Sequence, residues 1–172
     1  MEKVVIYPGT FDPITEGHLD IIEAGLKLFD KVVIGILTNP EKIHMFNFIT
    51  RLEFIQNSLS DRNLEVDKIE IGSSNKLTAD FVKEYSNVVG ILRGLRLNID
   101  YEYELILAFN NIKLNANIQT ILIPPKQEHI HISSTVVRQL VQFEQYDRLD
   151  GYVTKTVRDY IMANFPPGKS VL

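Results

Sequence analysis

The sequence contains no cysteine among its 172 residues, so disulfide bonds and thiolate chemistry are excluded. This absence fits the reducing cytosol, and we expect a cytoplasmic protein. Long hydrophobic runs are also lacking: the segment 88–92 is far short of the roughly 20 apolar residues that a membrane span needs. Because the first residues do not have the form of a signal peptide either, we expect no membrane association.

Nothing in the sequence has the clustered positive charge that is typical of nucleic-acid binding. The formal net charge is −4, and no run of lysine and arginine is present, so we expect no nucleic-acid partner. With 45% hydrophobic and 23% charged residues, the chain has an ordinary globular composition and can bury a core as one domain. An acidic protein that binds anions must concentrate positive charge locally, which draws attention to Lys42, Arg93 and Arg96.

Short β-branched runs alternate with longer segments of helical periodicity, without internal repeats or linkers. We expect strands at residues 4–7, 32–37, about 64–71, 88–92 and 120–123. Helices are expected from about Gly17, from a capping box at Thr50, at 77–85 and 100–114, and from Ser133 or Ser134. The alternation predicts an α/β fold, a Rossmann-like doubly wound parallel sheet of five strands in a single domain over residues 1–172. A last helix at 154–164 predicts a C-terminal helical extension over about 145–165.

Parallel sheets of this kind bind ligands beyond the carboxyl ends of their strands, where the strand order reverses. The first expected strand runs into the segment GTFDPITEGH at residues 9–18. Gly9 and Gly17 would let the backbone turn sharply and approach a ligand closely. Thr10 is placed to meet a phosphate oxygen at the strand end. His18 lies in the first turn of a helix, where the dipole favours an anion and keeps an imidazole neutral while it still offers an N–H donor.

The segment at residues 9–18 resembles the signature of the phosphopantetheine adenylyltransferases, nucleotidyltransferases with an HxGH motif in which the first histidine is replaced, as by Thr15 here. The resemblance covers nearly the whole chain. It implies a transferase of coenzyme A biosynthesis that moves the adenylyl group of ATP to 4′-phosphopantetheine and releases dephospho-coenzyme A and pyrophosphate. It also implies a homohexamer, with coenzyme A as a candidate inhibitor.

The resemblance assigns roles to residues at the first two strand ends. His18 would stabilise the transition state. Thr10 and Lys42 would hold the acceptor phosphate as catalytic residues, although Lys42 by itself would be read as a solvated loop lysine. Thr10 and Phe11 would also contact ATP, and Thr78, in the divergent segment 75–78, would contact the substrate.

The segment RGLR at residues 93–96 follows the apolar run at 88–92 directly. Guanidinium groups suit phosphate because they stay charged and donate two hydrogen bonds at once. The resemblance places Arg93 on the side of the pantetheine phosphate and Gly94, Leu95 and Arg96 on the ATP side. It also makes Glu104 a contact to the nucleotide, whereas Glu102 is best explained as an acid on a helix surface.

The segment ISSTVVR at residues 132–138 resembles the ISSTxxR motif of the superfamily. Hydroxyl groups and free amides at a helix start form a phosphate cradle, and Arg138 lies one turn further along. The resemblance assigns ATP contacts to His129, Ile130, His131, Ile132, Ser133, Ser134, Thr135 and Arg138. The preceding segment KQEHIH departs from the family pattern, and two histidines without a third ligand favour loop residues over a metal site. We expect no metal-binding side chains, and Mg²⁺ as the cofactor that arrives with ATP.

Two alternatives remain. One is a sibling enzyme, such as a nicotinamide mononucleotide adenylyltransferase or a cytidylyltransferase, against which Thr15 and the RGLR segment argue. The other is a non-catalytic nucleotide-binding sensor on the same scaffold. A protein that had lost activity would be expected to have lost His18, Lys42 or Arg138, and all three are present.

Overall fold

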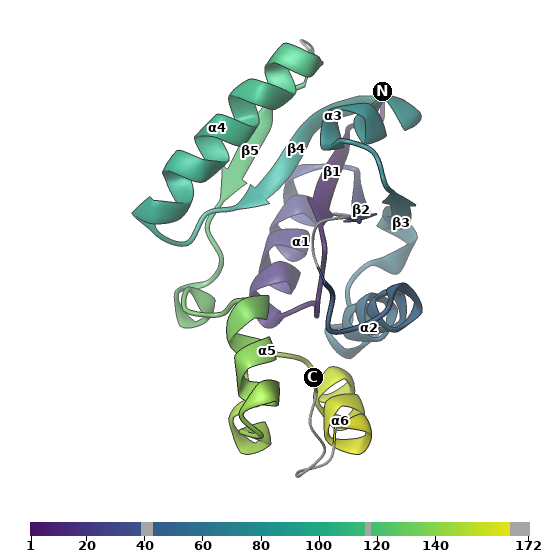
Figure 1. The fold of residues 1–172 in the computed structure, drawn as a ribbon. Coiled ribbons are helices and arrows are strands. Elements are labelled where there is room, and N and C mark those ends of the chain that lie inside the picture. The colour runs from purple at the N-terminus through teal and green to yellow at the C-terminus, as the bar shows by residue number, and fades with distance from the viewer. Residues whose placement is uncertain (39–42, 116–117, 166–172) are drawn as a thin grey trace.

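The computed structural model describes residues 1–38, 43–115 and 118–165 and has a five-stranded sheet at its centre (Figure 1). Every strand pair is parallel. The order β3-β2-β1-β4-β5 reverses direction between β1 and β4, which is the switch point of a Rossmann-like sheet. The predicted five-stranded α/β fold is therefore confirmed. The strands are β1 (Val4–Gly9), β2 (Lys31–Leu37), β3 (Ile69–Ser74), β4 (Val88–Gly94) and β5 (Thr120–Ile123).

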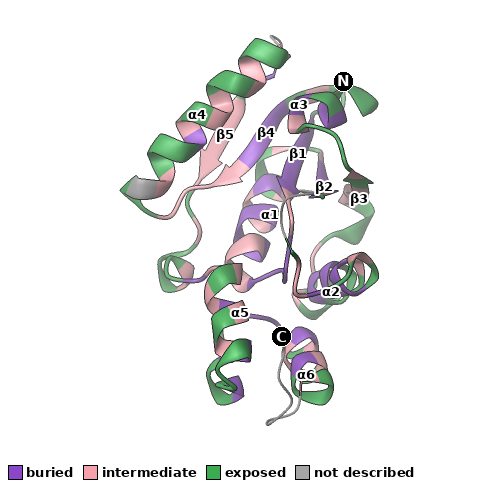
Figure 2. Cartoon of the chain, viewed as in Figure 1, coloured by how far each residue is buried: buried purple, intermediate pink, exposed green. Residues whose placement is uncertain are grey.

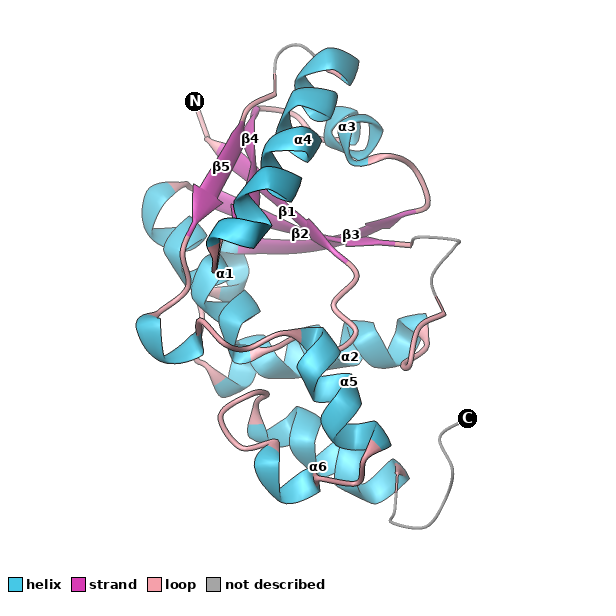
Figure 3. Ribbon diagram, turned by 60° about the vertical axis from the view of Figure 1, so that its left-hand side comes forward, coloured by secondary structure: helices cyan, strands magenta, loops and turns pink. Residues whose placement is uncertain are grey.

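Helices cover both faces of the sheet. Figure 3 shows α3 and α4 on one side and α1 and α2 on the other, while α5 and α6 lie beyond the carboxyl ends of the strands. Short 3-10 helices occupy residues 66–68, 82–84, 127–129 and 146–148. No helix of the described residues is long and apolar enough to cross a membrane. The α-helices are α1 (Glu16–Leu28), α2 (Phe48–Asp61), α3 (Thr78–Phe81), α4 (Asn98–Leu114), α5 (Ser134–Gln142) and α6 (Lys155–Asn164).

The sheet separates two hydrophobic clusters because successive side chains of a strand point to opposite faces. On β1, Val5 joins the larger cluster with α1 and α2, whereas Ile6 joins the smaller cluster with Phe81 of α3. Both residues are fully buried, and β1 and β2 are the most deeply buried strands (Figure 2). Burial on both faces explains why these strands are continuous apolar runs instead of alternating patterns.

Several expected element boundaries were wrong: β1 extends to Gly9, α4 begins at Asn98, and the expected helix at 77–85 is α3 followed by a 3-10 turn. Asn47, rather than Thr50, caps α2: its side-chain oxygen accepts a hydrogen bond from the Thr50 amide at 2.9 Å. The third strand begins only at Ile69, because residues 66–68 form a 3-10 turn. The strand β4 extends to Gly94, so Arg93 lies within it, and Val89 is 41% exposed instead of buried. The expected cap of α5 is confirmed at Ser133, whose hydroxyl accepts from the amide of Val136 at 3.2 Å.

Candidate functional site

A cleft of about 960 Å³ opens beyond the carboxyl ends of β1 and β4, bounded by the start of α1, by α4 and by the start of α5. The sequence-predicted residues that line it are Thr10, His18, Thr78, Arg93, Gly94, Arg96, Glu104, Ile132, Ser133, Ser134, Thr135 and Arg138. The structure thus brings three distant motifs together at the switch point of the sheet.

Some predicted residues are placed elsewhere. The Phe11 ring is 1% exposed and packs in the hydrophobic core. Lys42 lies outside the described residues. The residues of the lining do not include Leu95, His129, Ile130 and His131.

Gly9 and Gly17 of the first motif differ in how much space a side chain would have at each position. A Cβ atom on Gly9 would lie 3.0 Å from the Phe11 ring, so a larger residue there would fit only if this buried ring shifted. Gly17 lies in the first turn of α1 with a φ outside the left-handed region, and a Cβ there would meet nothing nearer than 3.8 Å. The expectation that Gly17 permits a sharp turn was therefore wrong.

His18 is held in one tautomer by Thr15, the cap of α1. The backbone N–H of Thr15 donates to Nδ1 of His18 at 3.0 Å, and the Thr15 hydroxyl lies 2.8 Å from the same nitrogen. A ring nitrogen that accepts a backbone N–H carries no proton, so the proton of the neutral ring is on Nε2. The capping box therefore fixes both the orientation of the ring and the atom that can donate.

The surroundings of His18 keep its ring neutral. Burial, together with the positive charges of Arg96 and Arg93, lowers the pKa of His18 to about 4. The ring packs edge-on against Phe11 with the ring centres 5.2 Å apart, and Tyr7 lies beyond at 6.2 Å. A histidine with this pKa is a neutral N–H donor throughout the physiological pH range, as its helix-start position predicts.

Arg93 and Glu104 form a two-donor ion pair across the cleft wall. Nε and Nη2 of Arg93 each donate to a carboxylate oxygen of Glu104 at 2.7 Å, and Nη1 donates to the Pro8 carbonyl at 3.0 Å. Burial acts to lower the pKa of Arg93, but the hydrogen bonds and charge of Glu104 outweigh it and raise the value. Glu104 is 6% exposed, so its carboxylate orients Arg93. Glu102 is exposed on the same helix, as expected.

The start of α5 is attached to the loop between β1 and α1. The Ser134 hydroxyl donates to the Pro13 carbonyl at 2.8 Å, and Nη1 of Arg138 donates to the Asp12 carbonyl at 2.7 Å. Nη2 of Arg138 also donates to the Thr135 hydroxyl at 3.1 Å. The first backbone N–H groups of α5 have no partners within the helix, so this end is suited to bind an anion.

Arg96 joins the motif after β4 to the segment that precedes α5. Its Nη1 donates to the Ile132 carbonyl at 3.0 Å, and its Nε donates to Asp100 at 3.2 Å. These two hydrogen bonds fix the orientation of the guanidinium group, and Arg96 still lines the cleft. Arg96 therefore brings positive charge to the cleft wall next to His18, whose pKa it lowers.

The histidines of segment 126–131 are directed away from the cleft. Nδ1 of His129 lies 2.6 Å from a carboxylate oxygen of Asp20, which also accepts the backbone N–H of Lys126 at 3.0 Å. The ring of His131 packs edge-on against Tyr152 with centres 5.3 Å apart. Within the described residues, no group of three metal-ligating side chains comes together.

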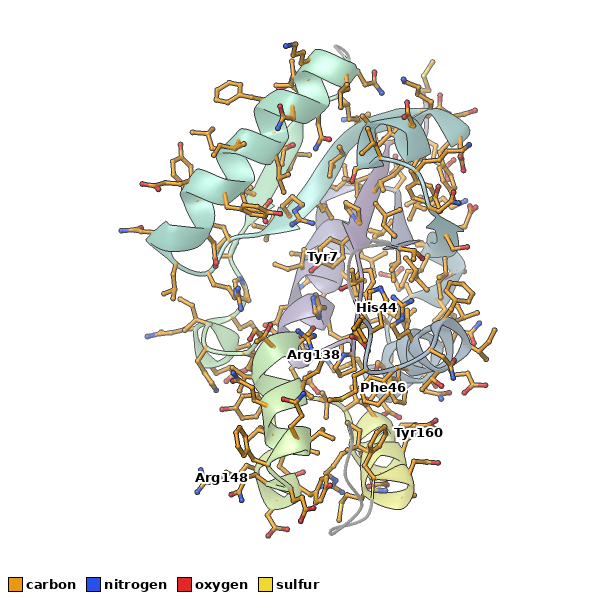
Figure 4. All side chains as sticks on the ribbon, in the orientation of Figure 1. Tyr7, His44, Phe46, Arg138, Arg148 and Tyr160 are labelled. Atoms are coloured by element: carbon orange, nitrogen blue, oxygen red, sulfur yellow. The ribbon has the colours of Figure 1, made fainter. Side chains whose placement is uncertain are left out.

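Two residues that were not predicted also shape the site. Asp12 is buried, and its carboxylate accepts the backbone N–H groups of Met45 at 3.0 Å and Phe46 at 2.9 Å. Phe46 and Arg138, labelled in Figure 4, thus approach Asp12 from the loop before α2 and from α5. Tyr7 lines the cleft from β1, and burial raises the pKa of its phenol well above the ordinary value. For Asp12, the sequence offered one signal of a role in the site, namely an acidic residue within the glycine-containing motif. For Tyr7, the only signal was its position at the end of a strand.

Known proteins resemble this chain in both sequence and structure. A profile described as cytidylyltransferase-like matches residues 6–140. The phosphopantetheine adenylyltransferase of Pelagibacter ubique is 46% identical over 145 residues, which is 84% of this chain and 88% of that protein. The enzyme of the same name from Nautilia profundicola is 42% identical over 83% of this chain and 90% of its own length.

Two solved structures share the fold of this chain at lower sequence identity. A putative nicotinate-nucleotide adenylyltransferase from Vibrio parahaemolyticus superposes with a TM-score of 0.70 at 18% identity, over 95% of this chain and 93% of that one. A nicotinic acid mononucleotide adenylyltransferase of Plasmodium falciparum, complexed with NaAD, gives 0.69 at 18% identity over 95% and 96%. At such identity the match establishes a shared fold. The sequence relatives are far closer, and the chain belongs to the phosphopantetheine adenylyltransferase family.

Proposed function

We propose that this protein transfers the adenylyl group of ATP to 4′-phosphopantetheine and forms 3′-dephospho-coenzyme A and pyrophosphate, a step of coenzyme A biosynthesis in the cytoplasm. The observation that carries the proposal is the neutral His18 donor in one cleft with Arg93 and the start of α5. Membership of the family adds the identity of the acceptor.

The reaction needs no covalent intermediate on the protein. An oxygen of the 4′-phosphate attacks the α-phosphorus of ATP, and the bond from that phosphorus to the bridging oxygen of pyrophosphate breaks. The attacking group is already an anion, so the protein has only to align the reactants and stabilise developing charge. Nε2–H of His18 is assigned to an oxygen of the α-phosphate, where charge accumulates in the transition state.

The acceptor phosphate is assigned to the β1 and β4 ends of the cleft. Three N–H groups of the Arg93 guanidinium donate to Glu104 and Pro8 and hold it in one orientation. Its other N–H groups are assigned to the phosphate in the cleft. Thr10 lines the same cleft, and we assign Lys42 to the same phosphate on the basis of the family resemblance alone. Thr78 lines the cleft on the far side of the sheet, where the pantetheine arm would extend.

ATP is assigned to the α5 side. Ser133, Ser134, Thr135 and Arg138 would hold the departing pyrophosphate, with Gly94 and Arg96 alongside. A contact of ATP with the backbone of Leu95 rests on the family resemblance alone. Segment 129–132 is assigned a backbone role: the carbonyl groups of His129 and Ile132 lie near Gly17 at the start of α1, whereas both histidine rings are directed away.

Mg²⁺ is proposed as the cofactor, bound by the phosphate oxygens of ATP. The carboxylates near the phosphate positions are engaged, since Asp12 accepts two backbone amides and Glu104 holds Arg93. The donors that face the cleft therefore suit phosphate, and the metal would supply charge neutralisation on the departing pyrophosphate.

We also propose a homohexamer, with α4 contributing to contacts between subunits. The helix exposes Tyr103, Ile106 and Phe109, each more than 60% accessible. Such residues on one helix are typical of a protein interaction surface. The number six comes from the family resemblance, and light scattering of the purified protein would measure it. Coenzyme A, which contains the pantetheine and adenylate parts of the product, is the candidate inhibitor.

Release of pyrophosphate from ATP tests the function. The protein is assayed with 4′-phosphopantetheine, with nicotinamide mononucleotide and without an acceptor. We expect release that depends on 4′-phosphopantetheine. Release with nicotinamide mononucleotide would instead favour a sibling enzyme, and the absence of release with ATP bound would favour a nucleotide sensor.

A further inference from the structure

Arg51, on α2, is an arginine buried against the first motif. It is 2% exposed, and its Nη1 donates to the Thr10 carbonyl at 2.6 Å, while its Nε has no hydrogen-bond partner among the described residues. Burial lowers the pKa of Arg51, and the charge of Asp12 offsets part of that effect. No carboxylate among the described residues forms an ion pair with Arg51, and a buried charge without one is costly, which favours a role beyond stability.

The acceptor of this hydrogen bond adjoins a strained residue. Phe11 has a φ of 48°, in the left-handed region that bulky side chains avoid, and its ring is locked in the core. Rotation of the peptide between Thr10 and Phe11 by half a turn would bring this φ into the negative range and relieve the strain. The same rotation would remove the Thr10 oxygen from Arg51, so the Arg51 hydrogen bond opposes it.

The orientation of this peptide matters because its two polar groups point in opposite directions. Thr10 lines the cleft and Arg51 does not. With the carbonyl held by Arg51, the Phe11 N–H is on the opposite side, and it donates to no other described group. A rotated peptide would direct a carbonyl oxygen, which is partly negative, at the phosphates.

We propose that Arg51 is a positioning residue that holds the Thr10–Phe11 peptide so that the Phe11 N–H is offered to a phosphate oxygen. The inference rests on the proposed function. It also gives Phe11, whose ring is buried in the core, a way to contact ATP through its backbone.

Substitution Arg51→Met tests the proposal because it keeps the side-chain length and removes the charge and the donors. We expect kcat to fall about 10²-fold, as for a small misplacement of the reacting groups. The KM values should change less than about 3-fold, and the melting temperature should fall little, because apolar replacement of a buried charge is often tolerated. Arg51→Lys, which keeps a charged donor, should recover part of the lost kcat.

A matched control is Ser58→Ala, on the same helix. It removes a buried hydrogen bond to Thr154 of 3.0 Å that does not touch the first motif. This variant should lose stability and keep its kcat. A kcat of Arg51→Met within 3-fold of the unaltered protein would overturn the proposal, as would an equal loss of kcat in Ser58→Ala.

A crystal structure of Arg51→Met gives a readout that does not depend on activity. We expect Phe11 at a negative φ, with the Thr10 carbonyl directed at the cleft. A φ that stays near its present positive value would overturn the inference. If the unaltered protein released no pyrophosphate, the proposed function would fail, while this structural result would still decide what Arg51 does to the peptide.

Discussion

Both the strand ends of β1 and β4 and the connecting segment 126–131 carry residues that were expected to contact substrates, but these residues are placed differently. His18, in the first turn of the helix that follows β1, and Arg93, near the end of β4, line the cleft, and each is fixed by at least two contacts. In the connecting segment, His129 binds Asp20 and His131 packs on Tyr152, outside the cleft. A parallel sheet dictates where side chains at its strand ends lie, whereas a loop is free to direct similar residues elsewhere.

The largest effect should come from His18→Ala. Loss of one donor to the transition state costs about 10²–10³ in kcat, and the fold should persist because the ring lies at the edge of the cleft. Steady-state kinetics and circular dichroism measure the two quantities. Near-normal turnover in a folded variant would show that His18 does not stabilise the transition state. His18 would then not differ in function from His129 and His131.

Substitution Glu104→Gln should have the next largest effect. It removes the charge that aligns Arg93 and sets an amide N–H₂ against a guanidinium donor. We expect kcat/KM for 4′-phosphopantetheine to fall about 10²-fold, the cost of misplacing a substrate-positioning group, with the KM for ATP less affected.

The matched control is Glu102→Gln, which alters an exposed acid on the same helix and should leave both parameters unchanged. Equal losses in the two variants would show that the charge of α4, rather than the pair with Arg93, is what matters.

The sequence predicted the strand ends well because their geometry follows from periodicity and from the parallel sheet. Arg93 was expected at the cleft from its place after a strand and Ser133 from its place at a helix start, in both cases together with the family resemblance, and both residues line the cleft. The contacts that fix them depend on tertiary packing between distant segments, so nothing local predicted that Glu104 would hold Arg93 or that Asp12 would bind the amides before α2. The direction of the His129 ring was missed for the same reason, since its partner Asp20 lies 109 residues away.

The pH dependence of stability tests whether His18 is buried and neutral in the folded protein. The pKa of His18 is about 4 in the folded protein and near its ordinary 6.5 when unfolded. Between these values the unfolded state binds the additional proton, so the free energy of unfolding falls as the pH drops from 6.5 toward 4. The expected loss from this group between pH 7 and pH 5 is about 2 kcal/mol.

Urea unfolding at pH 7 and pH 5 measures this loss in the unaltered protein and in His18→Gln, which does not titrate there. The unaltered protein should lose about 2 kcal/mol more than the variant. An equal loss in both proteins would mean that His18 is solvated like an ordinary surface histidine.

The smallest effect on catalysis should come from His129→Ala. The ring contacts Asp20 on α1, and Asp20 keeps the Lys126 amide and Arg62 as partners, so the segment stays attached. We expect a loss of about 1–2 kcal/mol in the free energy of unfolding, as for one buried hydrogen bond, and an unchanged kcat at saturating substrate. Chemical denaturation and steady-state kinetics on the same preparation measure both. A loss of kcat approaching that of His18→Ala would place the His129 ring in the reaction, and the distinction between strand end and loop would then fail.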